Sequence, residues 1–416
     1  REGFGGALVL IGSAALWGFG ALQRHPAVAL LPALLFIVPG VAFLIAWNRT
    51  KTTASLVVLA TVVIMVLFTG GALANHYYQR GYRSAHPESS LPPLPETPVV
   101  WIWSGAVTDS SATVVARLDA ATAELTVVAA NGEAAPNASV ERIDDVWRFE
   151  LDGLAPNTKY TYYVTADGDE VQARSGTFST FSTEPLSFTV AAASCARLGS
   201  NGAVYEAIVA ADPDLFIATG DLFYADYVET AAHFTHAYES SLAQPSQAHL
   251  YASVPIAYVW DDHDYGRNDS DATAPTRQLA IDAYSANVPY YPRGADDAVY
   301  QAFEIGRVRF VLMDDRSHRD PHATPDGPGK SMLGAEQLSW LQSELLAGSD
   351  ANALTVIISQ VPWIAEPAEG ADHWGGYSFE RSLIADFMAE HDIRNVLMVA
   401  GDTHMVAIDD GSNTNY

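Results

Sequence analysis

The sequence predicts a mixed fold of three parts: an all-α membrane region, a small all-β sandwich and a layered α/β domain. Three observations support this prediction. Uncharged apolar runs fill most of residues 1–80, β-type alternation follows over residues 99–183, and apolar runs alternate with helical stretches from residue 186 onward. The chain has 416 residues, which is more than a single hydrophobic core usually accommodates.

The first part, residues 1–80, contains apolar runs at 4–22, 26–47 and 54–74, and none of them carries a charge. Each run matches the roughly 20 residues that a helix needs to cross a bilayer. A buried helical hairpin and a cleaved signal peptide are the alternatives, but consecutive uncharged runs of this length are rare in soluble domains. We therefore expect a multi-pass anchor in the cell membrane. The Lys and Arg residues of the connecting segments are balanced and do not decide the orientation, and we expect the larger part of the chain to lie outside the cytoplasm.

Residues 81–98 contain five prolines among Ser and Glu residues, which is typical of a semi-extended linker. Residues 99–183 then consist of short alternating runs such as "SATVVARL" and "YTYYVTA", separated by turn residues. In "LDGLAPNTKYTYYV", Tyr160 and Tyr162 follow a turn in the manner of the tyrosine corner of a fibronectin-like sandwich, with an unrelated β-hairpin as the alternative. We expect a small β-sandwich here, which by itself says little about function.

Residues 186–416 predict an α/β domain, because buried apolar runs alternate with stretches of helical length. The expected strands lie at 186–194, 214–219, 254–260, 308–314, 353–359 and 395–401. The expected helices lie at 202–211, 230–242, 275–285, 335–346 and 380–390. In such sheets, function collects at the carboxyl ends of the strands.

Five of the six loops that follow these expected strands carry side chains able to bind a metal ion. The loops contain Ser194, Cys195 and Arg197; Asp221 and Tyr224; the run from Asp261 to Asp269; the run from Asp314 to Arg319; Gln360; and Asp402 with His404. Carboxylates crowded at one sheet edge repel each other unless cations lie between them. The pattern therefore predicts a site that holds more than one metal ion.

The stretch "GDLFYAD" after the second strand shows how such a site is built. Gly220 lets the backbone turn sharply, so that Asp221 points back over the sheet edge, where one carboxylate can bridge two ions. Tyr224 lies three residues further on and can reach the same ion as a phenolate, which favours a hard trivalent ion such as Fe(III).

The pattern Gly-Asp-x-x-Tyr resembles a signature of the calcineurin-like metallophosphoesterases. Their motif Gly-Asn-His is replaced by Asp261-Asp262-His263, and their motif Gly-His-x-His by Gly401-Asp402-Thr403-His404. In these replacements the sequence resembles the alkaline phosphatase D family. That family also has Ser-Cys, Trp-Asp-Asp-His, Asp-x-Arg-Ser-x-Arg and Met-Leu-Gly-x-x-Gln-x-x-Trp-Leu motifs, all of which occur in this chain. The stretch "ADHWGGYSFER" at 371–381 also resembles a family segment.

The resemblance covers roughly residues 98–410 and implies a layered α/β sandwich of the calcineurin-like metallophosphoesterase type, preceded by the small β-sandwich. Two features depart from the family. Membrane helices are expected in place of a secretion signal, and the chain ends soon after His404, where the family continues with further strands. We therefore expect the domain over 186–416 to be incomplete at its C-terminal end.

The resemblance implies at least two metal ions, an Fe(III)-type site and a Ca(II)-type site, with other divalent ions as alternatives. Asp221 is expected to bridge them. The expected ligands of the iron-type ion are Cys195, Tyr224 and His404. The expected ligands of the second ion are Asp262, Asn268 and Asp402, whose oxygen atoms suit a hard cation. The alternatives are a helix cap for Asp221, a core position for Cys195 and a packing role for Tyr224.

The remaining roles concern the phosphate group. His263 is expected to protonate the leaving oxygen or to stabilise its charge. Arg197 and Arg319 are expected to bind phosphate oxygens, whereas Arg316 is expected to form a structural ion pair with Asp314.

The favoured hypothesis is a membrane-anchored metal-dependent hydrolase of phosphomonoesters or phosphodiesters, acting through a metal-bound hydroxide. A phospholipase D-like phosphodiesterase acting on lipid or envelope polymers is an alternative, and a non-catalytic membrane-anchored binding protein is another. A covalent mechanism at Ser194 or Cys195 lacks the Gly-x-Ser-x-Gly motif.

A formal net charge of −27 argues against nucleic-acid binding, and the single cysteine excludes an internal disulfide. The sequence predicts no oligomeric state.

Overall fold

The computed structural model describes residues 90–136, 138–226 and 228–411. The expected anchor over residues 1–80 lies outside these ranges. Within them, no helix combines the length and the apolar composition needed to span a bilayer. All described residues fall within one compact unit, which comprises residues 85–416.

The N-terminal half of this unit is built from β-strands. The strands are β1 (Val99–Gly105), β2 (Ser111–Leu118), β3 (Ala123–Ala129), β4 (Ser139–Ile143), β5 (Val146–Asp152), β6 (Lys159–Ala166), β7 (Asp169–Glu170) and β8 (Gly176–Ser179), with a short 3-10 helix η1 (Gln172–Arg174) before β8. Strands β3, β6, β7 and β8 form one antiparallel sheet, while β4, β5, β2 and β1 belong to a larger one. The predicted β-strands are therefore confirmed.

The tyrosine corner expected in this region is also present. Tyr160 is buried, and its hydroxyl accepts a hydrogen bond from the backbone N–H of Ala155 at 2.8 Å. Tyr162, two residues further on, is buried instead against the end of a helix, where its hydroxyl donates to the carbonyl of Ala252 at 3.4 Å.

Replacing Tyr160 with phenylalanine should lower the free energy of unfolding by about 1 kcal/mol, because the Ala155 N–H loses its partner at a half-buried position. Urea unfolding of the two proteins measures this difference. Tyr163→Phe is the control, since Tyr163 lies on the same strand and is half-buried. Equal losses for the two variants would show that the hydrogen bond of the corner contributes nothing specific.

The C-terminal half alternates strands and helices. Its strands are β9 (Val190–Ala193), β10 (Leu215–Thr219), β11 (Ile256–Val259), β12 (Gln301–Ile305), β13 (Val308–Leu312), β14 (Leu354–Ser359) and β15 (Val396–Ala400). Its helices are α4 (Ala203–Ala210), α5 (Ala231–Leu242), α6 (Pro245–Ser253), α7 (Asp262–Tyr265), α8 (Arg277–Asn287), α9 (Gly334–Ala351), η2 (Trp374–Tyr377) and α10 (Ser378–Glu390). All expected strands and helices are present, and β12, α6, α7 and η2 are additional.

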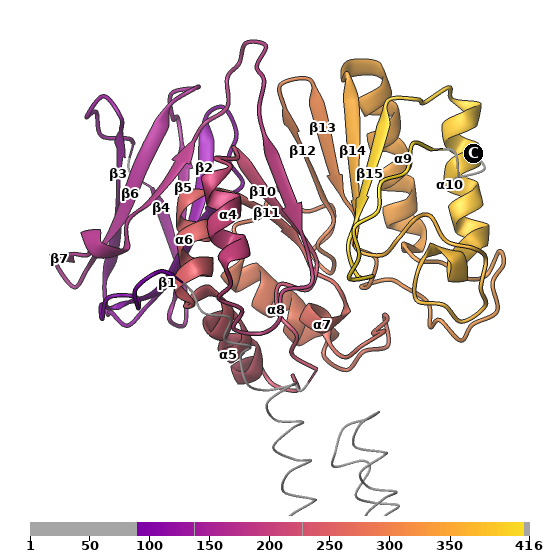
Figure 1. Cartoon of the computed structure of the whole chain (residues 1–416), viewed down its shortest axis with the longest axis horizontal. Coiled ribbons are helices and arrows are strands. Elements are labelled where there is room, and N and C mark those ends of the chain that lie inside the picture. Colours follow the sequence, from indigo (N-terminus) through magenta and orange to yellow (C-terminus); the bar gives the residue numbers. More distant parts are fainter. Residues whose placement is uncertain (1–89, 137, 227, 412–416) are drawn as a thin grey trace, which may run out of the picture. The chain divides into compact units, whose positions relative to one another are not determined.

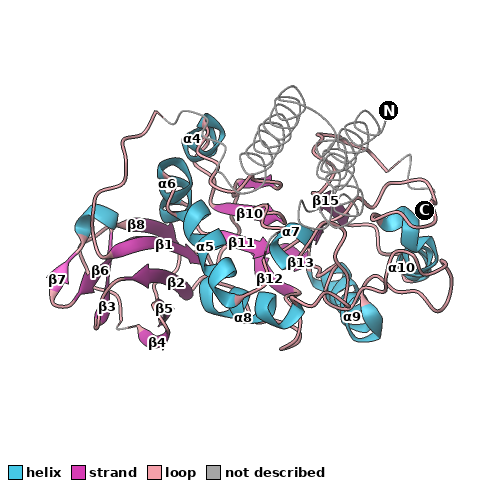
Figure 2. Cartoon of the chain, turned by 90° about the horizontal axis from the view of Figure 1, so that it is seen from below, coloured by secondary structure: helices cyan, strands magenta, loops and turns pink. Residues whose placement is uncertain are grey.

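Two sheets hold this half together (Figure 1, and Figure 2 with the strands in magenta). Strands β11, β10 and β9 are parallel neighbours in a seven-stranded sheet, and β13, β14 and β15 are parallel neighbours in a four-stranded sheet. Successive residues of β13 enter different cores: Phe310 faces the core shared with the first sheet, while Val311 packs with α9 and α10. The second sheet is thus covered on both faces, as a layered α/β fold requires.

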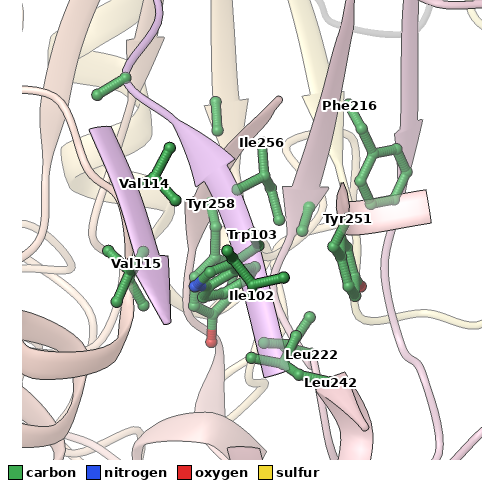
Figure 3. Close-up of a cluster of buried hydrophobic side chains, with 14 of the residues drawn as sticks. Ile102, Trp103, Val114, Val115, Phe216, Leu222, Leu242, Tyr251, Ile256 and Tyr258 are labelled. Atoms are coloured by element: carbon green, nitrogen blue, oxygen red, sulfur yellow. The ribbon is translucent and has the colours of Figure 1, made fainter. Parts of the chain in front are cut away.

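One sheet runs from the β-sandwich into the α/β half, because β1 pairs in parallel with β11. The two strands pair at Gly105 and Ile256, where an added Cβ on the glycine would lie 2.5 Å from the carbonyl oxygen of Ile256. A continuous core follows the junction, with Trp103 edge-on to Tyr251 at 5.6 Å between ring centroids (Figure 3). The domain boundary that the sequence predicts between residues 183 and 186 lies in the connection from β8 to β9. It stays a prediction, since the seven-stranded sheet contains strands from both sides of this boundary.

Candidate metal centre

The strand ends of the two sheets meet at one place. Gly401, at the end of β15, donates its N–H to the carbonyl oxygen of Gln360 at the end of β14, at 3.1 Å. A Cβ on Gly401 would lie 2.7 Å from the carbonyl oxygen of Thr219 and 2.8 Å from the Cβ of Ser194. Thr219 ends β10 and Ser194 directly follows β9, both in the other sheet, so the prediction that the loops gather at one edge is confirmed.

The residues expected around the iron-type ion come together. The ligand atoms of Cys195, Asp221 and His404 all lie within 4.8 Å of one another. The Tyr224 hydroxyl contacts Nε2 of His404. The backbones of Cys195, Asp221 and His404 are in the left-handed region, with φ values of 62°, 52° and 52° respectively. Non-glycine residues seldom adopt this conformation, and it clusters at functional sites.

The electrostatics of this group suit a cation. Asp221 is buried, and burial, together with the charge on Asp262, raises its pKa to about 6. Among the described residues, no group donates a hydrogen bond to its Oδ1. Burial also raises the pKa of Cys195 to about 11 and raises the pKa of Tyr224. Leaving Oδ1 of Asp221 buried without a partner costs free energy. A cation bound there would satisfy this oxygen and would also favour the ionised forms of Cys195 and Tyr224. The residues therefore fit a metal ion.

Asp221 also belongs to a second group. Its carboxylate, that of Asp262 and a ring nitrogen of His263 lie within 4.8 Å of one another. A third group overlaps with the second and consists of Asp262, Asp269 and Asp372. Within it, the N–H of Asp269 donates to Oδ2 of Asp262 at 2.6 Å. A residue shared between neighbouring groups is the arrangement that a bridging carboxylate requires.

The other two residues expected at the calcium-type site differ in position. Asp402 is half-buried, and its pKa is raised by burial and by the charges of Asp372 and Asp262, so it faces the third group. Asn268 is exposed, and its side chain makes no hydrogen bond within the described part of the chain. Its neighbour Asp269 lies in the third group instead, with φ at 61°. The ligand role of Asn268 stays a prediction.

His263 is held by a residue to which sequence reasoning assigned no role. Its Nδ1 lies 2.5 Å from Oδ1 of Asp226, and its Nε2 lies 3.9 Å from Oδ1 of Asp262. The ring of Tyr224 packs on the imidazole at 4.1 Å between centroids. Burial by itself lowers the pKa of His263, but the hydrogen bond to Asp226 and the charges of Asp262 and Asp221 outweigh it and raise the pKa to about 9.

The two arginines expected to bind phosphate lie in different environments. Arg197 is exposed, and no hydrogen bond or ion pair of its side chain is found among the described residues. Arg319 is fully buried, where its Nη2 donates to Oδ1 of Asp372 at 2.7 Å and its Nε donates to the Tyr377 hydroxyl at 2.8 Å. Its Nη1 has no partner within the described ranges. The phosphate roles of both arginines stay predictions.

The expected partner of Arg316 was wrong. Its backbone N–H donates to Oδ1 of Asp314 at 3.0 Å, but its guanidinium group binds Asp261 and Asp372. Asp314 is already satisfied, because it also accepts bonds from Trp260 and Ser317. The carboxylate is thus occupied by neutral donors, which leaves the arginine free to reach across the sheet edge.

Sequence reasoning missed Asp226, Asp269 and Asp372. Each lies in a stretch with a recognisable motif: Asp226 in "GDLFYAD", Asp269 in the loop after Trp260, and Asp372 in "ADHWGGYSFER". The available signal was a carboxylate beside a predicted ligand or inside a family-like segment. This signal did not reveal which residues the three carboxylates contact, because only the folded loops bring them to His263 and Asp262.

Two sheets whose strand ends gather carboxylates, a thiol, a phenol and imidazoles define a class of protein, a layered α/β fold with a candidate metal centre at one sheet edge. Residues 188–415 match the PhoD-like phosphatase family, which is more than half of the chain, and the chain belongs to this family. It is 28% identical over 308 residues to alkaline phosphatase D of Bacillus subtilis (strain 168), a match that covers 61% of this chain. The match covers 52% of that relative, so the chain spans about half of its length.

A solved structure described as PhoD is similar in fold. It superposes with a TM-score of 0.63 at 22% sequence identity, covering 77% of this chain and 73% of that one. At this level of identity the likeness shows the fold, and the site must be argued from its own residues.

Proposed function

We propose that this chain is a metal-dependent hydrolase that cleaves phosphoester bonds. The observation that carries the proposal is the position of Asp221, a buried carboxylate that belongs to two neighbouring ligand groups and keeps one oxygen without a partner among the described residues. Membership of a family of phosphatases supports the same reaction. The experiment that tests it is hydrolysis of nitrophenyl phosphate and bis-nitrophenyl phosphate by purified protein, with metal content measured before and after chelation.

Two sets of residues would hold the ions. Cys195, Tyr224 and His404 offer the sulfur, phenolate and imidazole donors that suit a transition metal such as Fe(III). Asp262 and Asp402 offer the oxygen donors that suit a hard cation such as Ca²⁺, and Asn268 or Asp269 would complete that set. Ions bound there would polarise a phosphoryl oxygen and lower the pKa of water.

The chain's own residues supply the rest of the chemistry. Asp226 holds Nδ1 of His263, so that Nε2 is the nitrogen left to donate a proton to the leaving oxygen. Arg197 is exposed and can meet the phosphate from the solvent side. Arg319 would contact phosphate only through its unpartnered Nη1.

The substrate that we propose is a phosphate ester, either a monoester or a diester. We also propose that residues 1–80 hold the protein at the cell membrane, with the domain over residues 186–416 outside the cytoplasm. A lipid or envelope phosphodiester would suit such a location.

If Tyr224 and Cys195 bind Fe(III), purified protein should show a visible charge-transfer band, and Tyr224→Phe should weaken or shift it. The reason is that the phenolate oxygen is the donor lost, while the ring that packs on His263 remains. Absorption spectra with iron analysis on the same samples measure the effect. Tyr163→Phe on β6, far along the chain from the site, is the control and should leave the band unchanged. A colourless, iron-free and fully active protein would reject iron as the metal.

A further inference from the structure

Arg316 lies in the loop after β13 and is completely buried. Asp314 stabilises the turn that carries Arg316, because its carboxylate accepts hydrogen bonds from the backbone N–H groups of Arg316 and Ser317 at 3.0 Å each. The guanidinium group is thereby aimed into the space between the loops that follow β11 and β14. No part of it faces the solvent from which a substrate would arrive.

The guanidinium group joins two carboxylates from different loops, and its Nη2 lies 3.9 Å from Oδ2 of a third, Asp262. Its Nε donates to Oδ1 of Asp261 at 2.6 Å. Its Nη1 and Nη2 donate to the two oxygens of Asp372 at 3.1 Å and 2.9 Å, and Nη1 also reaches the carbonyl oxygen of Ser270 at 3.3 Å. Every polar nitrogen of Arg316 is therefore used by these loops, and this side chain ties them together.

Asp261 is the N-cap of α7, the single turn that carries Asp262 and His263. Its side chain accepts the N–H of Asp264, while Asp264 accepts the N–H groups of Asp261 and Phe223 at 3.1 Å each. A four-residue helix has no stability of its own in water. Its position thus depends on its capping residue, and the ionic partner of that residue is Arg316.

We propose that Arg316 is a positioning residue: it holds α7, and with it Asp262 and His263, in register with the segment around Asp372. Its effect on catalysis rests on the proposed function. Lysine cannot replace it, because a single ammonium group cannot donate to Asp261, as Nε does, and at the same time form the bidentate contact that Nη1 and Nη2 make with Asp372. Arginine in this place therefore acts through the loops and not on the substrate.

The test compares Arg316→Lys with Arg319→Lys in metal-free protein. Both arginines are fully buried and both bind Asp372, but the contact with Asp261 belongs to Arg316. Amide hydrogen exchange is measured at Tyr265 and Gly266, whose N–H groups donate to the carbonyls of Asp261 and Asp262. Exchange there should be about tenfold faster in Arg316→Lys, which corresponds to about 1.4 kcal/mol of local stability, and unchanged in Arg319→Lys.

A second variant keeps the test decisive if Arg316→Lys does not fold. Asp261→Asn preserves a good N-cap but loses the charged partner of Arg316. By itself it should speed exchange in α7 to a similar degree. Where Arg316→Lys does fold, the double variant should exchange no faster than the faster of the two single variants, since both changes remove the same contact with Asp261. Unchanged exchange in both single variants would overturn the proposal, and so would strict additivity.

Kinetics distinguish positioning from phosphate binding. In metal-loaded protein, Arg316→Lys should lower kcat by about 10–100-fold, as expected for a small displacement of reacting groups, with KM and inhibition by inorganic phosphate within about twofold of wild type. A rise in KM together with weaker phosphate inhibition would show that Arg316 binds phosphate itself. Exchange is independent of turnover, so a wild-type protein without phosphoesterase activity would remove the proposed function while the exchange data still decided the role of Arg316.

Discussion

Replacing Asp221 with asparagine should abolish phosphoester hydrolysis and reduce the content of both metal ions. Asp221 lies in two ligand groups and is buried, so a neutral amide there removes a charge that both ions would share. Metal ions supply several kcal/mol of transition-state stabilisation, and each 1.36 kcal/mol is a factor of ten in rate, so we expect a loss of about 10³-fold or more. The measurement is kcat/KM together with metal content on the same preparation.

The matched control is Asp315→Asn. Asp315 is also buried, burial raises its pKa to about 6, and its Oδ1 likewise has no partner among the described residues. Its other oxygen accepts bonds from Ser359 and Gln360, at the carboxyl end of β14 but outside all three ligand groups. The control should lose stability but keep its metal. If Asp221→Asn retains both ions and most of its activity, Asp221 is not the bridge and the proposed centre is wrong.

Replacing His263 with alanine should leave the metal in place and lower kcat by about 10²–10⁴-fold, the usual contribution of general acid catalysis. His263 adjoins Asp262, and its Nε2 is free of the hydrogen bond that holds Nδ1. The loss should be smaller for nitrophenyl esters than for alkyl esters, because nitrophenolate needs little protonation. The measurement is kcat against the pKa of the leaving group, with metal content determined in parallel.

Asp226→Asn provides the graded comparison for this variant. It keeps the imidazole but weakens the bond that orients it, so kcat should fall less than in His263→Ala and with the same dependence on the leaving group. If His263→Ala loses metal as completely as Asp221→Asn, His263 is a ligand. If it keeps metal and full activity on alkyl esters, the proton comes from elsewhere.

Most of the fold could be predicted from local patterns. The strands of the α/β half are continuous apolar runs, and their loops carry glycine and aspartate at the turns, so their order and their carboxyl ends are visible in the chain. The exceptions have local causes. Helix α6 is polar and begins at a proline, and α7 is a single turn held by a pair of aspartates that cap it reciprocally, so neither has the apolar periodicity that marks a helix.

The site divides in the same way. Asp221, Cys195, Tyr224 and His404 could be named in advance, because each lies in a loop that follows a strand and in a motif that resembles the alkaline phosphatase D family. Asp226, Asp269 and Asp372 could not, because their role depends on where loops of different strands cross. Asp372 follows β14 by 13 positions, and the chain between them contains no regular strand or helix that would fix its direction.

The sequence by itself determined the order of elements, the edge at which chemistry collects and the types of donor gathered there, since these follow from periodicity and from turn residues. Only the tertiary structure decided which charges neutralise which. Arg316 was expected to pair with its near neighbour Asp314, but Asp314 is saturated by neutral donors, and the arginine binds Asp261 and Asp372 instead. The joining of β1 to β11 was likewise decided by packing, at the one glycine that lets the strands approach. Such choices depend on distances between segments far apart in the chain, which no local pattern encodes.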